Sequence, residues 1–309
     1  MAYDQHWSFG VQQQLTRTVV AEIGYVGNHG VHLQGSQDLN DPPAGAGSVA
    51  ARRPYPVFGG ITLFSSEIGD TYNSLQAKVS GRLNHGLTYL AAYTWSKFLQ
   101  SNPSPALGGN NGYEKSISQF NIPQNFAFSM SYELPFGKGK SYLSNANGWV
   151  NGALGGWQIQ NITVLRSGLA YTPIISRDVA NTGVGSQRPI QIGSGALQHR
   201  TLNDWFNQAD FVLPAQYTYG TSKAFILQGD MYRQYDVSVF KAFPITEGTR
   251  LEFRSEFFNL PNVTSFNPPS LAANSTAAPA AAVDTSTGGK ILSTSTNPRQ
   301  IQFALKLYF

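Results

Sequence analysis

"QFALKLYF", residues 302–309, ends the sequence on an aromatic residue with no polar tail after it. Larger apolar side chains alternate with other residues along this stretch, and that period of two predicts a β-strand. One face carries Phe303, Leu305, Leu307 and Phe309, and the other carries Gln302, Ala304, Lys306 and Tyr308. Chain ends are usually frayed and hydrophilic. A strand that continues to the last residue therefore suggests that the end itself is recognised and inserted somewhere.

The composition favours many strands separated by turns. Of the 309 residues, 12% are charged and 13% are aromatic, and 31 Gly and 17 Pro supply turn positions. A helical bundle would need more Ala, Leu, Glu and Lys at helical spacing. No run of 18 apolar residues occurs, so no transmembrane helix is predicted. The opening "MAYDQHWSFG" has neither a basic region nor an apolar one, so we expect no signal peptide in it.

The charge and the cysteine count exclude several partners and reactions. The net charge is +4 and the 21 basic residues are scattered, which predicts no nucleic-acid partner. The sequence contains no Cys, so it has neither a disulfide framework nor a thiolate nucleophile.

The alternation recurs along the chain and predicts nine antiparallel strands. They cover residues 6–15, 18–27, 72–83, 87–97, 124–134, 155–168, 234–243, 249–260 and 300–309. The connections alternate between short links and stretches of roughly 26 to 60 residues, and one link of about 20 residues, around 144–156, is the exception among the short ones. Short turns at one rim and long loops at the other are typical of an outer-membrane β-barrel. We therefore predict an all-β fold, a fragment of an antiparallel outer-membrane barrel with meandering strands and long extracellular loops.

The two faces of the predicted strands suggest two environments. The apolar face suits lipid, and the face rich in Gln, Ser, Arg and Glu suits a watery lumen. A girdle of aromatic residues at the membrane interface is predicted at Trp7, Phe9, Tyr93 and Trp95. A lumen-facing charge row is predicted at Arg250, Glu252, Arg254 and Glu256, and we expect pairing with charges on adjacent strands. The alternative is a soluble, secreted all-β binding protein with these aromatics in its core.

The sequence predicts no enzyme, no cofactor and no metal site. His29 and His32 lie in a predicted loop without a nearby acidic ligand. No G-x-S-x-G elbow occurs, and "GKGK" at residues 137–140 lacks the phosphate-loop pattern. We expect short helices near residues 144–156 and 201–214. Trp205, Phe206 and Phe211 of the second segment either pack the largest loop or contact cargo, and packing is the preferred interpretation.

Several segments resemble one family of membrane proteins. The chain contains "DQHWSFGVQQQL", "YNSLQAKVSGRLNHGLTYLAAYTWSKFL", "LGGWQIQNITVLRSGLAYTP" and "YDVSVFKAFPITEGTRLEFRSEFFNLPN". These segments, in this order, resemble the carboxyl-terminal barrel of Oar-type TonB-dependent receptor-like proteins. The resemblance implies a transporter barrel of about 22 strands, preceded by a signal peptide, a regulatory-like domain and a plug. Residues 1–309 would then be a partial barrel, with the plug, the signal peptide and the earlier strands absent from the sequence.

The resemblance also gives a reason for the apolar end. Barrels of this kind close with a strand that the barrel-assembly machinery recognises, and Phe303, Leu305, Leu307, Tyr308 and Phe309 supply the matching residues. It implies import of an unidentified nutrient across the outer membrane, with TonB acting only through the missing plug. The partners expected are outer-membrane lipid and the assembly machinery. An adhesin or export-associated scaffold and a passive porin are the alternatives.

The strand count makes a structural prediction. A single-chain bacterial barrel has an even number of strands because both ends return to the periplasm. Nine is odd, so we predict a curved sheet that is open or strained at the seam between its first strand, residues 6–15, and its last, residues 300–309.

Overall fold

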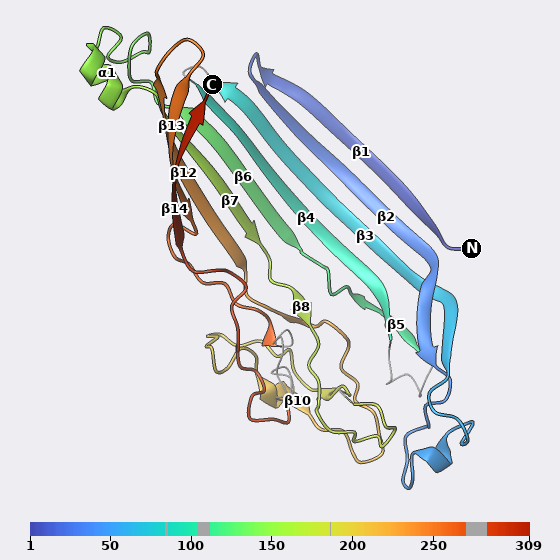
Figure 1. Cartoon of the computed structure of the whole chain (residues 1–309). Coiled ribbons are helices and arrows are strands. Elements are labelled where there is room, and N and C mark those ends of the chain that lie inside the picture. The colour runs from blue at the N-terminus through green and yellow to red at the C-terminus, as the bar shows by residue number, and fades with distance from the viewer. Residues whose placement is uncertain (84–85, 104–111, 186, 270–282) are drawn as a thin grey trace.

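The computed structural model describes the chain except residues 84–85, 104–111, 186 and 270–282. One large antiparallel sheet dominates it, with the strand order β1-β2-β3-β4-β6-β7-β12-β13-β14 (Figure 1). These strands are β1 Tyr3–Thr16, β2 Val19–Asp38, β3 Thr62–Leu83, β4 Leu87–Pro103, β6 Gln124–Glu133, β7 Trp157–Arg166, β12 Tyr232–Pro244, β13 Arg250–Phe258 and β14 Gln300–Tyr308. They correspond one to one with the nine predicted strands. The predicted meander is therefore confirmed.

The register keeps one set of side chains on one face across the sheet. Val79 pairs with Ala21 on one side and Ala91 on the other, and the row continues through Phe128 to Thr163. Directly opposed residues of antiparallel strands share a face. The residues that point to one face of a strand therefore determine which residues of the neighbouring strand point to that face. The apolar alternation of the separate strands therefore adds up to one continuous apolar surface, here called the outer face.

The sheet is open. β1 and β14 are its two edges, and no ladder joins them in the described part of the chain. Figure 1 shows the sheet with the two edges apart and with the C-terminus at the rim that carries the short turns. The prediction of an unclosed seam is confirmed. Each edge strand offers a row of unpaired backbone groups, which hydrocarbon does not tolerate.

Three local expectations are corrected. β2 continues to Asp38 through bulges near Leu33, so the segment with His29 and His32 is a strand and not a loop. β3 begins at Thr62, which makes the connection between these strands shorter than predicted. The segment predicted as a helix at 201–214 holds only the 3₁₀ turn η3 Gln208–Asp210 and the short strand β10 Phe211–Val212. The Asn207 side chain caps the start of this turn by accepting a hydrogen bond from the Ala209 amide.

One sheet strand was missed in the sequence. β5 Tyr113–Ile117 pairs with the far end of β4, from Leu99 to Pro103. It lies inside the stretch expected to connect two strands and is 5 residues long, so its alternation is too brief to be recognised. The long connections also contain β8 Ala170–Tyr171, β9 Ile190–Gln191, β11 Leu227–Gln228 and the 3₁₀ turn η1 Ala50–Arg52.

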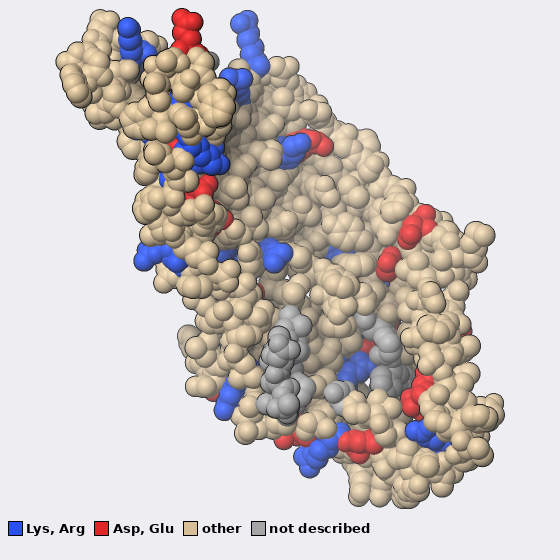
Figure 2. All heavy atoms as spheres, in the orientation of Figure 1, with Lys and Arg blue, Asp and Glu red and all other residues tan. Residues whose placement is uncertain are grey.

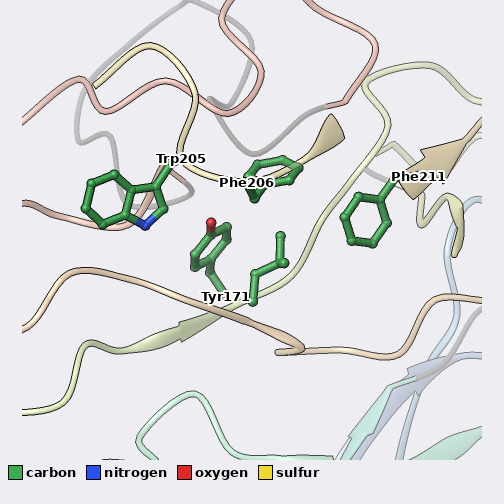
Figure 3. Close-up of a cluster of buried hydrophobic side chains, with 5 residues drawn as sticks. Tyr171, Trp205, Phe206 and Phe211 are labelled. Atoms are coloured by element: carbon green, nitrogen blue, oxygen red, sulfur yellow. The ribbon is translucent and has the colours of Figure 1, made fainter. Parts of the chain in front are cut away.

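The main buried apolar cluster of the described residues lies in the loops and not against the sheet. Figure 3 shows this loop core, which consists of Tyr171, Trp205, Phe206, Phe211 and Leu227. The Phe206 ring meets the Tyr171 and Phe211 rings edge-on, with centroids 6.1 and 5.7 Å apart. Trp205 and Phe206 are 8% and 2% exposed, so the packing interpretation of the largest loop is confirmed.

The opposite rim carries the predicted short helix. α1 Gly148–Leu154 lies in the connection between β6 and β7, beside the ends of β12 and β13 in Figure 1. Asn147 caps it by accepting a hydrogen bond from the Val150 amide at 2.9 Å. Among the described residues, no helix has the length and apolar character that a bilayer-spanning helix requires.

Candidate functional site

The outer face of the sheet is exposed and apolar, whereas the inner face is polar. Phe303, Leu305 and Leu307 are 67, 64 and 55% exposed, although they belong to a paired strand. On the inner face, Lys78 of β3 lies 3.7 Å from Glu22 of β2. Exposed side chains of this size cost free energy in water, and hydrocarbon removes that cost. The two faces therefore separate a lipid-compatible surface from a water-compatible wall.

The inner wall contains a hollow of about 360 Å³. Polar side chains from four adjacent strands contribute to its lining, among them Ser8, Glu22, Gln76, Lys78 and Thr94. Figure 2 shows Lys, Arg, Asp and Glu scattered over the face in view, without one large patch of a single sign. This wall suits water and polar solutes of either charge.

The predicted assembly strand is β14. Its outer-facing Leu307, Leu305 and Phe303 stand opposite Leu251, Phe253 and Ser255 of β13. The rings of Phe253 and Phe303 stack with centroids 6.2 Å apart. Tyr308 lies on the inner face. Phe309 follows the strand and is 98% exposed at the short-turn rim. Recognition of these residues by the assembly machinery stays a prediction.

The four predicted girdle residues lie on the outer face, near the long-loop half of the strands. Phe9 stands opposite Tyr25, and Leu75 stands between Tyr25 and Trp95. Tyr93 pairs with Ala77, two residues closer to the short-turn rim than Trp95. The Tyr25 hydroxyl donates to Asn73 Oδ1 at 2.5 Å, an arrangement with an apolar body and a polar tip that suits a membrane interface.

Trp7 extends this aromatic surface across a glycine. Its indole ring lies over Gly27 of β2, and a Cβ atom built there would come within 2.2 Å of the ring. Only glycine leaves room for the ring at this position. The girdle assignment itself stays a prediction.

The charge row lies on the inner face, but its pairing differs from the expectation. Arg254 Nε donates to Glu252 of the same strand, and Arg254 Nη2 donates to the Tyr308 hydroxyl of β14 at 3.0 Å. The Arg250 guanidinium lies 4.6 Å from the centre of the Tyr308 ring. Glu252 stands opposite Lys306 in the register, yet no ion pair joins them in the described structure. Arg254 reaches Glu252 along the strand, so the predicted cross-strand ion pairing is wrong for these two residues.

The fourth residue of the row, Glu256, stands opposite Gln302 on β14 and Ser238 on β12. These two cross-strand neighbours are neutral, so this end of the row presents a carboxylate to the inner wall. The row as a whole joins the last two strands by polar contacts on the water side, while apolar side chains cover the same strands on the other side.

The long connections are joined into one layer at the rim opposite the short turns (Figure 1). Arg188 and Glu114 form an ion pair between the β7–β12 connection and β5, and their side chains are 7 and 16% exposed. Glu114 also accepts the Ala224 amide at 2.9 Å. Asn181 Nδ2 donates to the carbonyl oxygens of Gly45 and Gly47, both at 2.8 Å, which ties in the β2–β3 connection. We call these joined connections the loop layer.

A buried carboxylate attaches the β13–β14 connection to the loop layer. The Asp284 side chain is 2% exposed and accepts hydrogen bonds from the Ser176 amide at 2.8 Å and from Arg177 Nε at 3.1 Å. Burial alone would raise the pKa of Asp284, but these hydrogen bonds outweigh burial and lower that pKa below its ordinary value. Burial in the loop core raises the pKa of Tyr171, so its hydroxyl stays neutral.

The rings of His29 and His32 contact backbone and hydroxyl oxygens of β3. His29 Nδ1 lies 2.7 Å from the Asp70 carbonyl oxygen and 3.1 Å from Thr71 Oγ1, and His32 Nδ1 lies 3.2 Å from the Ser66 carbonyl oxygen. Within the described ranges, no three His, Asp or Glu side chains gather in a way that could hold a metal ion.

The open sheet of consecutive antiparallel strands, its apolar outer face and its polar inner wall define an integral outer-membrane β-barrel protein. A family model described as "Outer membrane beta barrel domain" matches residues 1–302, so the chain belongs to that family. Its members' location places the chain in the outer membrane.

One solved structure similar to the chain is that of the outer membrane transporter YddB from Escherichia coli. The two share 12% sequence identity with a TM-score of 0.49, over 99% of this chain and 32% of that chain. The chain thus spans about a third of the transporter's length. No curated protein matches the sequence.

Proposed function

We propose that this chain forms part of an outer-membrane receptor barrel that imports a nutrient with energy delivered through TonB. The loop layer is the observation that carries the proposal. A receptor for a scarce solute needs an ordered extracellular surface that can hold its cargo. Here a loop core, a buried ion pair and a buried carboxylate fix the long connections to one another.

The inner wall supports the same function. It carries an ion pair and a row of alternating charges beside apolar residues such as Ile162. A released solute could pass along such a wall without meeting a continuous apolar surface. Four segments of the chain resemble TonB-dependent receptors, and this resemblance is the reason for proposing that TonB supplies the energy and that a plug domain fills the barrel. TonB would act through that plug, and the outer-face residues would contact lipid.

The proposal requires more strands than the sheet contains. The two open edges need partners inside a membrane. Further strands would supply them, and the assembly machinery would insert the closing strand β14. The proposal includes no enzyme activity and no cofactor.

An uptake assay in cells that make the full protein tests the proposal. We expect accumulation of the cargo to be lost when TonB is deleted and to return when TonB is supplied again. Uptake that continues without TonB would indicate a passive porin. An adhesin or export-associated scaffold would show no uptake in either strain, and the loop layer would instead bind a surface.

A further inference from the structure

The connection between β6 and β7, here called the rim loop and covering residues 134–156, presents an apolar surface at the short-turn rim. Trp149 of α1 is 93% exposed and Leu154 is 50% exposed. Other large apolar side chains of this loop are also exposed, namely Phe136, Tyr142, Leu143 and Val150. In Figure 2 the region of α1, at the upper left, consists mostly of uncharged residues. Outside a membrane, such a concentration of exposed apolar groups is unfavourable.

A buried lysine fixes the rim loop to the sheet. Lys241 of β12 is 4% exposed, and its Nζ atom donates to the Gly155 carbonyl at 2.6 Å and to the Ala153 carbonyl at 3.1 Å. These are carbonyl groups at the C-terminal end of α1, where the helix dipole favours a positive charge. Trp157 Nε1 donates to the same Ala153 carbonyl at 2.9 Å.

The register shows on which side of the sheet this attachment occurs. Lys241 stands opposite Trp157 of β7 and Phe253 of β13, and Phe253 stands opposite Leu305. These residues therefore share the outer face. The Lys241 ammonium lies 4.8 Å from the centre of the Trp157 ring and 5.0 Å from that of Phe243. The C-terminal end of α1 thus lies against the outer face, which is the face that meets lipid.

The rim loop is compact enough to hold α1 in one place. Asn151 Oδ1 accepts the Lys138 amide at 2.7 Å, which joins the start of the loop to the helix. Gly137 has a φ of +117°, and a Cβ atom there would come within 2.8 Å of the Gly155 Cα atom. The Phe136 and Tyr142 rings lie 5.7 Å apart. The apolar residues therefore belong to an ordered unit.

We infer that the rim loop is an interfacial anchor that lies in the phospholipid leaflet on the periplasmic side of the membrane. Its apolar surface continues the lipid-facing outer face, to which Lys241 attaches it. Tryptophan is enriched where acyl chains meet headgroups, and Trp149 would occupy that depth. The exposed Lys138 lies beside this surface, where its charge suits an anionic headgroup. The inference rests on the outer-membrane location and is independent of the proposed import.

Spin labelling can test the anchor because the chain has no cysteine of its own. The full protein would be made with Val150→Cys or with Gly248→Cys, which lies in the β12–β13 turn at the same rim. Outer-membrane vesicles would be labelled with a nitroxide, with the protein that lacks the introduced cysteine as the blank. Collisions with oxygen, which concentrates in lipid, would be compared with collisions with a water-soluble nickel complex.

We expect the oxygen-to-nickel collision ratio to be several-fold higher at position 150 than at position 248. Adding Trp149→Ser should bring the ratio at position 150 down toward that of position 248. Adding Lys241→Met should increase the mobility of the label at position 150, because the attachment of α1 is lost.

Three results would overturn the inference. Equal ratios at the two positions would show that the rim loop lies in water. Low collision rates with both reagents at position 150 would show burial against a protein. Dipolar broadening between labels would show that a second copy of the chain covers the loop.

Discussion

The guanidinium of Arg254 lies 3.0 Å from the hydroxyl oxygen of Tyr308, on the inner face of the last two strands. The same guanidinium donates to Glu252, so one arginine joins a carboxylate on its own strand to a phenol on the next. The contact adds a polar connection to the backbone ladder between β13 and the edge strand β14.

Tyr308→Phe should weaken the attachment of β14 by about 1 kcal/mol, because Arg254 loses a hydrogen-bond acceptor on a partly hydrated face. The ring that lies under Arg250 remains in this variant. Tyr308→Leu removes the ring as well, so it should weaken the attachment of β14 more than Tyr308→Phe does. Denaturant unfolding of the membrane-inserted protein would measure both variants. Equal midpoints for wild type and Tyr308→Phe would contradict a stabilising role for the contact.

Phe309→Asp should reduce the amount of assembled protein several-fold. Phe309 belongs to the predicted assembly signal, and a charge next to lipid costs up to a few kcal/mol depending on its depth. Ala304→Asp is the matched control, because it places the same side chain on the inner face of the same strand, opposite Arg254. Folded protein in the outer membrane is scored by its electrophoretic mobility before and after heating. If both variants assemble as well as the wild type, the terminal residue is not part of a signal.

Arg188→Met should release the β7–β12 connection from β5. It leaves the Glu114 carboxylate buried without its arginine, and breaking a buried pair in this way costs about 3–5 kcal/mol. The connection should then be cut faster by a protease added to intact cells. The double variant Arg188→Met with Glu114→Gln should recover part of the resistance, because no buried charge is left alone. A double variant more sensitive than the single one would contradict this account.

Acid should detach residue 284 from the loop layer. Because the pKa of Asp284 is lowered in the folded protein, its contribution to stability is fully present above the ordinary value of 3.8. That contribution is lost as the pH falls through the lower, folded-state pKa. Hydrogen exchange at the Ser176 amide, which donates to Asp284, should therefore become less protected in this range. Asp284→Asn should show weaker protection without this acid-dependent step, and an unchanged step in the variant would assign it to another group.

The sequence by itself determined nine of the sheet strands and their faces, but not β5 or the extensions of β2 and β3. In "TRLEFRSEFFNL" the alternation put Arg250, Glu252 and Arg254 on one face without any knowledge of the neighbouring strands. Side-chain direction in a strand is local, so a period of two survives whatever the strand pairs with. The contrast between short turns and long connections indicated a membrane barrel as well. The number of residues in each connection can be counted in the sequence without knowing the fold. The missing ladder between the first and last strands followed from the odd strand count.

Only the tertiary structure decided which groups meet. The register allows Glu252 to face Lys306, but the side-chain arrangement pairs it with Arg254 instead. Lys241 occupies an apolar position in the alternation, and that anomaly was the one sequence signal for the α1 attachment. Its partners are carbonyl groups from residues far away in the chain. The loop core and the Arg188 to Glu114 pair likewise join distant segments. Such contacts depend on how connections dock in space, and local alternation carries no information about docking.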